Sequence, residues 1–162
     1  RRREPRAMDA VARRLTPRGG FTLIEIALVM GVIGILSAIA VAGFTGYRER
    51  AHKSQAIIDM RSIDDEVRSF KRAAGRLRED LAEAGFAALL DPWGNPYQYS
   101  VLATVPRGKW RKDRFLVPIN SEFDLWSMGP DGRSVPPLTA NSSRDDIIRA
   151  NDGSFYGLAS QY

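Results

Sequence analysis

The stretch RGGFTLIEIALVMGVIGILSAIAVAGF, residues 18–44, decides the architecture of this chain. From Ile26 to Phe44 it carries no charged residue over 19 positions. At about 1.5 Å per residue, a helix of that length spans roughly 29 Å, close to the hydrocarbon thickness of a bilayer. A small domain rarely buries a helix that is apolar on all sides. The sequence therefore predicts a membrane-spanning helix rather than the core helix of a soluble domain.

The net charge of the chain is concentrated ahead of this helix. The 162 residues include 24 Lys and Arg, 19 Asp and Glu, one His and no Cys. Residues 1–20 hold seven arginines against Glu4 and Asp9, which accounts for the whole net charge of +5. Basic flanks stay on the cytoplasmic side, so the chain after Tyr47 is predicted to lie outside the inner membrane. Because the remainder is neutral, the basicity does not indicate a nucleic-acid partner.

The residue inventory also narrows the chemistry. Without Cys the chain has no disulfide framework, cysteine zinc site or thiol nucleophile. His52 is the only imidazole, which argues against a histidine metal site or a Ser-His-Asp triad. The acidic pair Asp64 and Asp65 is predicted to lie on an exposed helix face without a base or nucleophile. The sequence therefore predicts a protein that is not an enzyme.

Glu25 is the exception inside the apolar run. An unpaired carboxylate there would cost roughly a few kcal/mol, so it is expected to be functional and to have a partner. No Lys, Arg or His lies within residues 21–44. The partner must then come from another chain or from a new N-terminus. Cleavage after Gly20 would create an ammonium group on Phe21, which lies on the same helical face as Glu25.

The order RGGFTLIE, residues 18–25, resembles the prepilin peptidase site of type IV pilins and type II secretion pseudopilins. In that family a basic leader ends in Gly, the mature chain begins with Phe, and its fifth residue is Glu. The resemblance implies cleavage between Gly20 and Phe21 by the prepilin peptidase, followed by N-methylation of Phe21. It also implies that Glu25 pairs with the N-terminal ammonium of a neighbouring subunit during assembly.

Three segments are predicted: a basic leader over residues 1–20, a transmembrane and polymerisation helix over 21–47, and an extracytoplasmic head over 48–162. Met8 would begin a 13-residue leader, so residues 1–7 are expected to reflect an uncertain start codon. A secretory signal peptide is the alternative, because small-x-small cleavage patterns end at Ala40 and Ala42. The length of the apolar run and its internal carboxylate argue against that alternative.

Beyond Phe44 the helical pattern becomes amphipathic. Apolar residues recur at steps of three and four, and they are Ala56, Met60, Ile63, Val67, Phe70 and Ala74. One helix is therefore predicted from residue 21 to residue 74, with Gly75 as its stop. A short second helix is predicted over residues 79–90. Strands are predicted over residues 97–101, 114–119 and 123–128.

These elements predict an α+β fold that is pilin-like. Its parts are a long N-terminal helix, a short second helix, a small antiparallel sheet packed on the amphipathic half of the long helix, and a C-terminal loop region. The block DPWGNPYQY, residues 91–99, is a turn cluster followed by a strand. It resembles the head signature of the major pseudopilin of type II secretion systems. In that family the signature precedes an antiparallel sheet and a calcium loop.

The resemblance therefore implies a calcium ion bound by residues 127–147. The family pattern SLGADG corresponds here to SMGPDG, residues 127–132, and the later NADI corresponds to NSSRDDI, residues 141–147. Calcium prefers six to eight carboxylate and carbonyl oxygens. The candidate ligands are the carboxylates of Asp131, Asp145 and Asp146 and the carbonyls of Met128 and Arg133.

This region departs from the family pattern in two places, and one of them is the tail past Ile147. VPPL, residues 135–138, replaces a glycine-rich run. The alternative interpretation of the later part is a capping box over residues 143–146 that begins a short helix ending at Ala150. Both interpretations stay open. A further loop, RGKWRKDR at residues 107–114, holds five cations around Trp110, and we interpret it as a solvated loop rather than a polyanion site.

The sequence thus predicts a structural filament subunit, a pseudopilin or pilin that polymerises through its N-terminal helix. The resemblance implies a homopolymer at the bacterial inner membrane, with the head in the periplasm or in an extracellular filament. It implies as partners the prepilin peptidase, minor pseudopilins or pilins and an inner-membrane assembly platform. Protein secretion is the implied purpose, and a surface type IV pilus is the alternative. An alternative of another class is a secreted calcium-binding module released by signal peptidase.

Overall fold

Helix α1 runs from Leu23 to Ala74 in the computed structural model, which describes residues 20–162. The predicted leader before Gly20 lies outside the described residues. Gly75 ends the helix in a left-handed conformation (φ 72°), and its N–H bonds to the carbonyl of Lys71. The continuous helix and its glycine stop are therefore confirmed. The chain forms two compact units, one ending at Ala42 and the other running from Gly43 to Tyr162.

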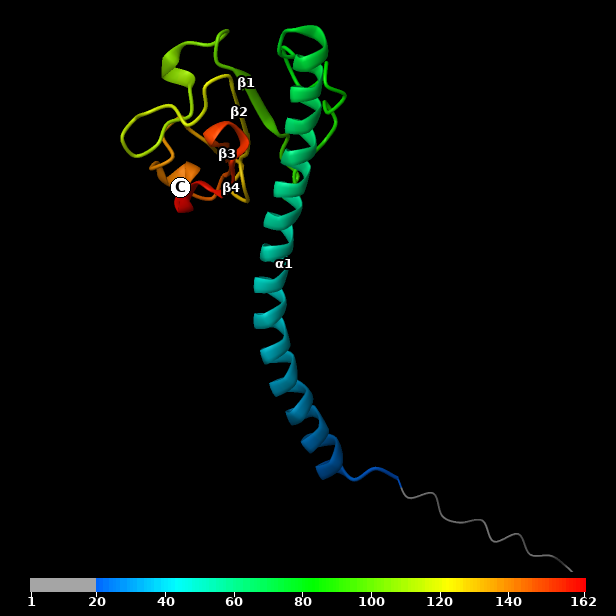
Figure 1. Cartoon of the computed structure of the whole chain (residues 1–162). Coiled ribbons are helices and arrows are strands. Elements are labelled where there is room, and N and C mark those ends of the chain that lie inside the picture. Colours follow the sequence, from blue (N-terminus) through cyan, green and yellow to red (C-terminus); the bar gives the residue numbers. More distant parts are fainter. Residues whose placement is uncertain (1–19) are drawn as a thin grey trace, which may run out of the picture. The chain divides into compact units, whose positions relative to one another are not determined.

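The second unit is a head built on one antiparallel sheet (Figure 1). The strand order follows the chain, β1-β2-β3-β4, and each strand pairs with the next in antiparallel register. The strands are β1 (Gln98–Val101), β2 (Phe123–Ser127), β3 (Ile147–Ala150) and β4 (Phe155–Leu158). Short 3-10 turns lie in the connections and at the end: η1 (Arg107–Lys109), η2 (Asn141–Ser143), η3 (Asn151–Gly153) and η4 (Ala159–Gln161).

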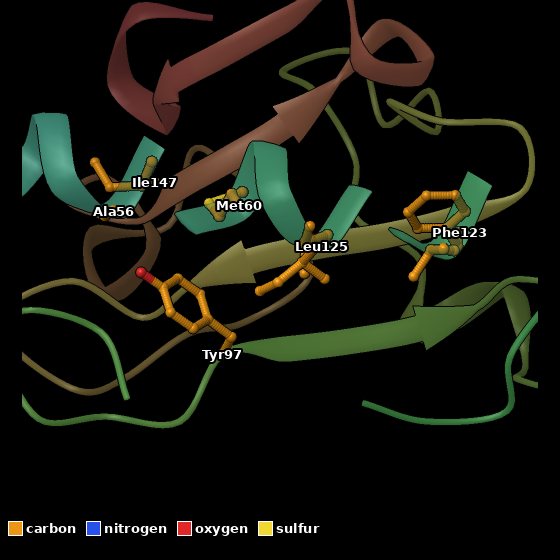
Figure 2. Close-up of a cluster of buried hydrophobic side chains, with 8 residues drawn as sticks. Ala56, Met60, Tyr97, Phe123, Leu125 and Ile147 are labelled. Atoms are coloured by element: carbon orange, nitrogen blue, oxygen red, sulfur yellow. The ribbon is translucent and has the colours of Figure 1, made fainter. Parts of the chain in front are cut away.

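The inner face of the sheet packs on the amphipathic part of α1 (Figure 2). Side chains alternate between the two faces of a strand, so Phe123 and Leu125 of β2 point inward and Trp126 points outward. The predicted helical stripe is confirmed from Ala56 to Val67 as the other half of this core, because Ala56, Met60, Ile63 and Val67 are fully buried. Its last two predicted members lie outside the core, since Phe70 is half-buried and Ala74 is exposed. Each large apolar side chain buried in this way contributes about 1.5–3 kcal/mol.

The outer face carries a second apolar cluster, which loops cover instead of a helix. Its buried members are Ile119, Leu138, Ile148, Ala150 and Ala159. Both clusters and the whole sheet belong to the unit from Gly43 to Tyr162. This unit therefore contains the complete core that it needs to fold on its own.

A buried ion pair ties the inner face of the sheet to α1. The Arg149 side chain is 1% exposed, and its Nε donates to Asp64 Oδ1 at 2.6 Å. Its guanidinium also donates to the Phe123 carbonyl at 3.0 Å and lies over the ring of that residue. Asp64 was predicted to be exposed, and that prediction is wrong because the carboxylate faces Arg149.

Two predicted elements are absent from the head. Residues 79–90 form turns instead of a second helix. Gly85 there has a left-handed φ of 81°, and the Asp80 carboxylate accepts the N–H of Glu83 as in a turn. Residues 114–119 form a tight turn instead of a strand, because Asp113 Oδ1 accepts the N–H groups of Phe115 and Val117, each at 2.8 Å.

The helix considered after residue 143 is also absent. Residues 141–143 form η2, and Ile147–Ala150 pairs with β4 as strand β3. The capping-box interpretation of residues 143–146 is therefore wrong. The sequence analysis missed β3 and β4, whereas the structure confirms strands close to the predicted bounds at β1 and β2.

We expect Arg149→Met to lower the free energy of unfolding of the head, residues 43–162, by about 1–3 kcal/mol, because Asp64 Oδ1 loses its buried donor while Oδ2 keeps its ion pair with Arg68 Nε at 2.8 Å. Urea unfolding followed by tryptophan fluorescence measures the change. The control is Lys53→Met, which breaks a partly exposed pair with Glu49 at 3.6 Å on the surface of α1. That control should change the stability by less than about 0.5 kcal/mol. Equal stability of the two variants would contradict the role given to Arg149.

Candidate functional site

The junction between Gly20 and Phe21 lies just ahead of α1. Neither residue belongs to the helix, and both are exposed, with the Phe21 side chain at 84%. A Cβ atom built on Gly20 would meet nothing within 4 Å. No described part of the chain therefore covers the peptide bond at which the sequence predicts cleavage.

A capping box begins α1 and holds Glu25. The backbone N–H and the hydroxyl of Thr22 both donate to Glu25 Oε2 at 3.0 Å, and the N–H of Glu25 donates to Thr22 Oγ1 at 3.2 Å. Such reciprocal bonds satisfy first-turn N–H groups that have no acceptor within the helix. The sequence analysis missed this role, although a Thr three residues before a Glu is its usual signal. Because these bonds use Oε2, Oε1 is available for the predicted ammonium of a neighbour.

The apolar part of α1 presents its side chains outward on every side. All residues from Leu23 to Val41 are exposed within the described chain. The helix is long and apolar enough to cross a membrane, as far as length and composition can tell. Apolar surface of this extent marks contact with lipid or with a protein partner.

Comparison with known proteins places this segment in a family. The prokaryotic N-terminal methylation motif matches residues 16–41. The type II secretion system core protein G of Escherichia coli K12 is 30% identical over 122 residues, which cover 70% of this chain and 82% of that protein. The chain belongs to the family of type IV pilins and type II secretion pseudopilins.

Both branches of this family are represented among its relatives. The type IV major pilin protein PilE of Neisseria gonorrhoeae is 30% identical over 152 residues, covering 85% of this chain and 88% of that protein. The type II secretion system core protein G of Klebsiella pneumoniae is 28% identical over 136 residues, covering 79% and 91%. No solved structure gives a significant match.

Family membership confirms several predictions at a coarse level. The chain is a structural filament subunit and not an enzyme. The family forms homopolymeric filaments from subunits processed by a prepilin peptidase. The methylation motif and the apolar helix agree with an inner-membrane pilin.

The block over residues 91–99 forms a junction within the head. Asp91 Oδ1 accepts the N–H of Asn95 at 2.8 Å, and its Oδ2 accepts the hydroxyl of Ser127 at 2.6 Å. The Asn95 side-chain amide donates to the Gly129 carbonyl at 2.8 Å. Tyr97 is buried, and its hydroxyl donates to the carboxylate of Asp59 in α1 at 2.9 Å. Burial is the larger cause that raises the pKa of this phenol, and the hydrogen bond to Asp59 raises it further. The block therefore fixes the end of β2 and the following loop to α1.

Two of the three predicted calcium carboxylates lie in adjoining parts of that loop. The N–H of Asp131 donates to Asp145 Oδ2 at 3.3 Å, and Asp131 Oδ1 accepts the N–H of Arg133 at 2.8 Å. Gly129 makes the approach possible, because a Cβ atom there would lie 2.5 Å from the Asp145 carbonyl oxygen. Gly129 also has a left-handed φ of 64°.

The third carboxylate, Asp146, is fully buried and engaged elsewhere. Its Oδ2 accepts hydrogen bonds from the Arg111 guanidinium and from the Ser134 hydroxyl. Burial raises the pKa of Asp146 to about 6, although the Arg111 charge and the bond from Ser134 act in the opposite direction. Burial likewise lowers the pKa of Arg111, against the attraction of Asp146.

The predicted calcium ligands therefore do not converge on one point. Among the described residues, no group of three His, Asp or Glu side chains is placed to hold a metal ion. The carbonyls of Met128 and Arg133 belong to the same loop, and one oxygen of each carboxylate around them already accepts a backbone N–H group or the Arg111 guanidinium. Calcium binding stays a prediction, and the geometry fits it less well than the sequence suggested.

The basic loop over residues 107–114 is only partly solvated. Arg107, Lys109 and Arg114 are exposed, and the half-buried Trp110 donates to the Val105 carbonyl at 3.1 Å. Arg111 differs from these cations because its side chain is 2% exposed. The sequence analysis missed it, since nothing in the local pattern distinguishes this arginine from its solvated neighbours.

We expect Thr22→Val to weaken the start of α1, because it removes the hydroxyl that accepts the N–H of Glu25. A lost cap of this kind costs about 1 kcal/mol, so the Glu25 amide proton should exchange about fivefold faster. The measurement is hydrogen exchange by NMR on the chain in detergent micelles. Ser37→Ala, inside the apolar part of α1, is the control and should leave that rate unchanged. An unchanged rate in Thr22→Val would show that the capping box does not form.

Proposed function

We propose that this chain is the major pseudopilin of a type II secretion system. The observation that carries the proposal is the DPWGNPYQY block, which resembles the head signature of that branch. In this chain the block fastens Ser127 and Gly129 to its own turn, so its sequence is tied to the architecture of the head. The core protein G relatives, which are covered over most of their length, support the same assignment.

Processing is proposed at the Gly20–Phe21 bond. The bond lies in the exposed segment before α1, and the methylation motif extends across it. Cleavage there would place a new α-ammonium group on Phe21, and N-methylation keeps that nitrogen basic. The mature chain would then begin one residue before the capping box, with its N-terminal charge close to Glu25.

Assembly is proposed to use the exposed apolar part of α1. In the membrane lipid surrounds these side chains, and in the filament the same helices of neighbouring copies would do so. The Oε1 atom of Glu25 would accept a hydrogen bond from the Phe21 ammonium of the next copy, which fixes the axial register. The inner-membrane assembly platform and the minor pseudopilins are the proposed partners, and the head is proposed to lie on the periplasmic side.

We expect Glu25→Ala to be processed normally but to assemble poorly. Removing one member of a buried ion pair costs about 3–5 kcal/mol, so filament yield should fall by at least about tenfold. Mass spectrometry of the N-terminal peptide from native membranes should find a methylated Phe21 at the start of both wild type and variant.

Thr22→Val separates the capping of α1 from the pairing of Glu25 with a neighbouring subunit, because it weakens the capping box and keeps the Glu25 carboxylate. It should therefore assemble nearly as well as the wild type. Normal filament yield from Glu25→Ala would contradict the pairing. A wild-type peptide that starts near residue 41 or 43 would instead indicate release by signal peptidase and a secreted module.

Deletion of the gene from its native host tests the choice between the two branches of the family. We expect proteins that the host normally secretes to accumulate in the periplasm, while surface pili and surface motility are retained. A plasmid copy of the wild-type gene should restore secretion, and a copy that encodes Glu25→Ala should not. Loss of surface pili with normal secretion would instead make the chain a type IV pilus subunit, which the similarity to the gonococcal pilin favours.

A further inference from the structure

Arg111 is a buried cation that touches the loops on which the sequence predicts calcium. Its Nη1 atom donates to the Ser134 hydroxyl at 2.5 Å and to the Val135 carbonyl at 2.7 Å. Its Nη2 atom donates to the Asp146 carboxylate, and its guanidinium lies 4.9 Å from the centre of the Trp126 ring. One side chain therefore joins the loop after β2, the segment before β3, and β2 itself.

The atoms around this guanidinium are of the kind that surrounds a hard metal ion. A hydroxyl, a backbone carbonyl and a carboxylate all present oxygen to it, as they would to calcium. Guanidinium carries a permanent positive charge and several N–H donors in a fixed plane. It can thus neutralise a buried carboxylate and orient a carbonyl at once, which are the two tasks of a structural cation in a loop.

Further hydrogen bonds extend the network around Arg111, in which the buried Nε atom of Arg111 has no hydrogen-bond partner among residues 20–162. The Ser134 hydroxyl, which accepts from Arg111, donates onward to Asp146 at 2.6 Å. The Ser143 hydroxyl donates to the Val135 carbonyl at 2.8 Å and accepts the N–H of the same residue at 2.9 Å. Side-chain hydrogen bonds therefore join the loop after β2 to the segment before β3, and they join both to Arg111.

The backbone next to Arg111 adds a second brace. The N–H of Lys112 donates to the Pro136 carbonyl at 3.1 Å, and the N–H of Leu138 donates to the Lys112 carbonyl at 2.9 Å. The N–H of Arg111 itself donates to the Asp124 carboxylate at 2.8 Å. The segment VPPL, which departs from the glycine-rich family pattern, is the part that pairs here.

The carboxylate oxygens of Asp131, Asp145 and Asp146 provide few ligands for a divalent ion. Asp145 and Asp131 each accept a backbone N–H group. Asp146 Oδ1 is buried without a hydrogen-bond partner, but it is one oxygen beside a guanidinium that would repel a metal ion. A calcium shell needs six to eight oxygens.

We propose that Arg111 supplies the cation of this loop in place of calcium, so that the head folds and keeps its C-terminal loops without a metal ion. The inference rests on the contacts of Arg111 and does not depend on which branch of the family the chain serves. The cation site is thus filled by the Arg111 side chain, which is held by a hydroxyl, a carbonyl and a carboxylate oxygen, the kinds of oxygen that a metal ion would use.

The first test is the thermal melting of the head, residues 43–162, in excess chelator and in millimolar calcium. We expect the two midpoints to agree within about 2 °C, because a ligand that does not bind leaves stability unchanged. A calcium-dependent rise of more than about 5 °C, or saturable calcium binding by calorimetry, would overturn the proposal. This measurement uses the unmodified head, so it does not depend on the folding of any variant.

The second test removes the guanidinium. Arg111→Gln should lower the midpoint in chelator by roughly 10 °C or more, because it strands the buried Asp146 carboxylate. Arg114→Gln, three residues away and exposed, is the matched control and should not shift the midpoint. The double variant Arg111→Met and Asp146→Leu, which removes both charges, should recover a large part of the loss. The proposal would be overturned if the Arg111→Gln head had the same melting midpoint as the Arg114→Gln control.

Discussion

One helix has to satisfy two different surroundings, and the rest of the structure depends on that constraint. From Ile26 to Val41, α1 is apolar on every side and has no cover within the described chain. From Ala56 to Val67 it is apolar only along a stripe, and the sheet closes over that stripe. The first surface needs lipid or other copies of the chain, whereas the second is satisfied by the head. A subunit of this kind can fold its head alone but cannot bury the helical residues from Leu23 to Val41 alone.

Two buried arginines organise the head in the absence of any disulfide. Arg149 lies between the sheet and α1, and Arg111 lies between the loops on the outer side of β2. Each pairs with a buried aspartate and lies over an aromatic ring, Phe123 or Trp126. Buried pairs add little net stability compared with apolar packing, but they penalise any arrangement that leaves one charge alone. The two pairs therefore favour one docking of the loops and the helix over others.

The sequence could predict those features that have a local signal. The three- and four-residue spacing gave the stripe on α1, and alternation gave β1 and β2. The prediction of a second helix over residues 79–90 was wrong because this segment forms turns. Gly85 there adopts a left-handed conformation, and the Asp80 carboxylate accepts the N–H of Glu83. Strand β3 was missed because its four residues follow a pattern that also suits a helix start, and only pairing with β4 decides between them. The buried role of Arg111 depends on residues 23 to 35 positions away in the chain, so no local pattern could reveal it.

The exposed helix also determines how reversible a filament of such subunits can be. Moving the residues from Leu23 to Val41 from lipid into a bundle of like helices exchanges one apolar surrounding for another. The hydrophobic effect, which rewards removal from water, contributes little to that exchange. The free energy of that exchange then depends on how closely the helices pack and on the environment of the Glu25 carboxylate. Passage of a subunit between the bilayer and such a filament would therefore change the hydrophobic free energy little in either direction.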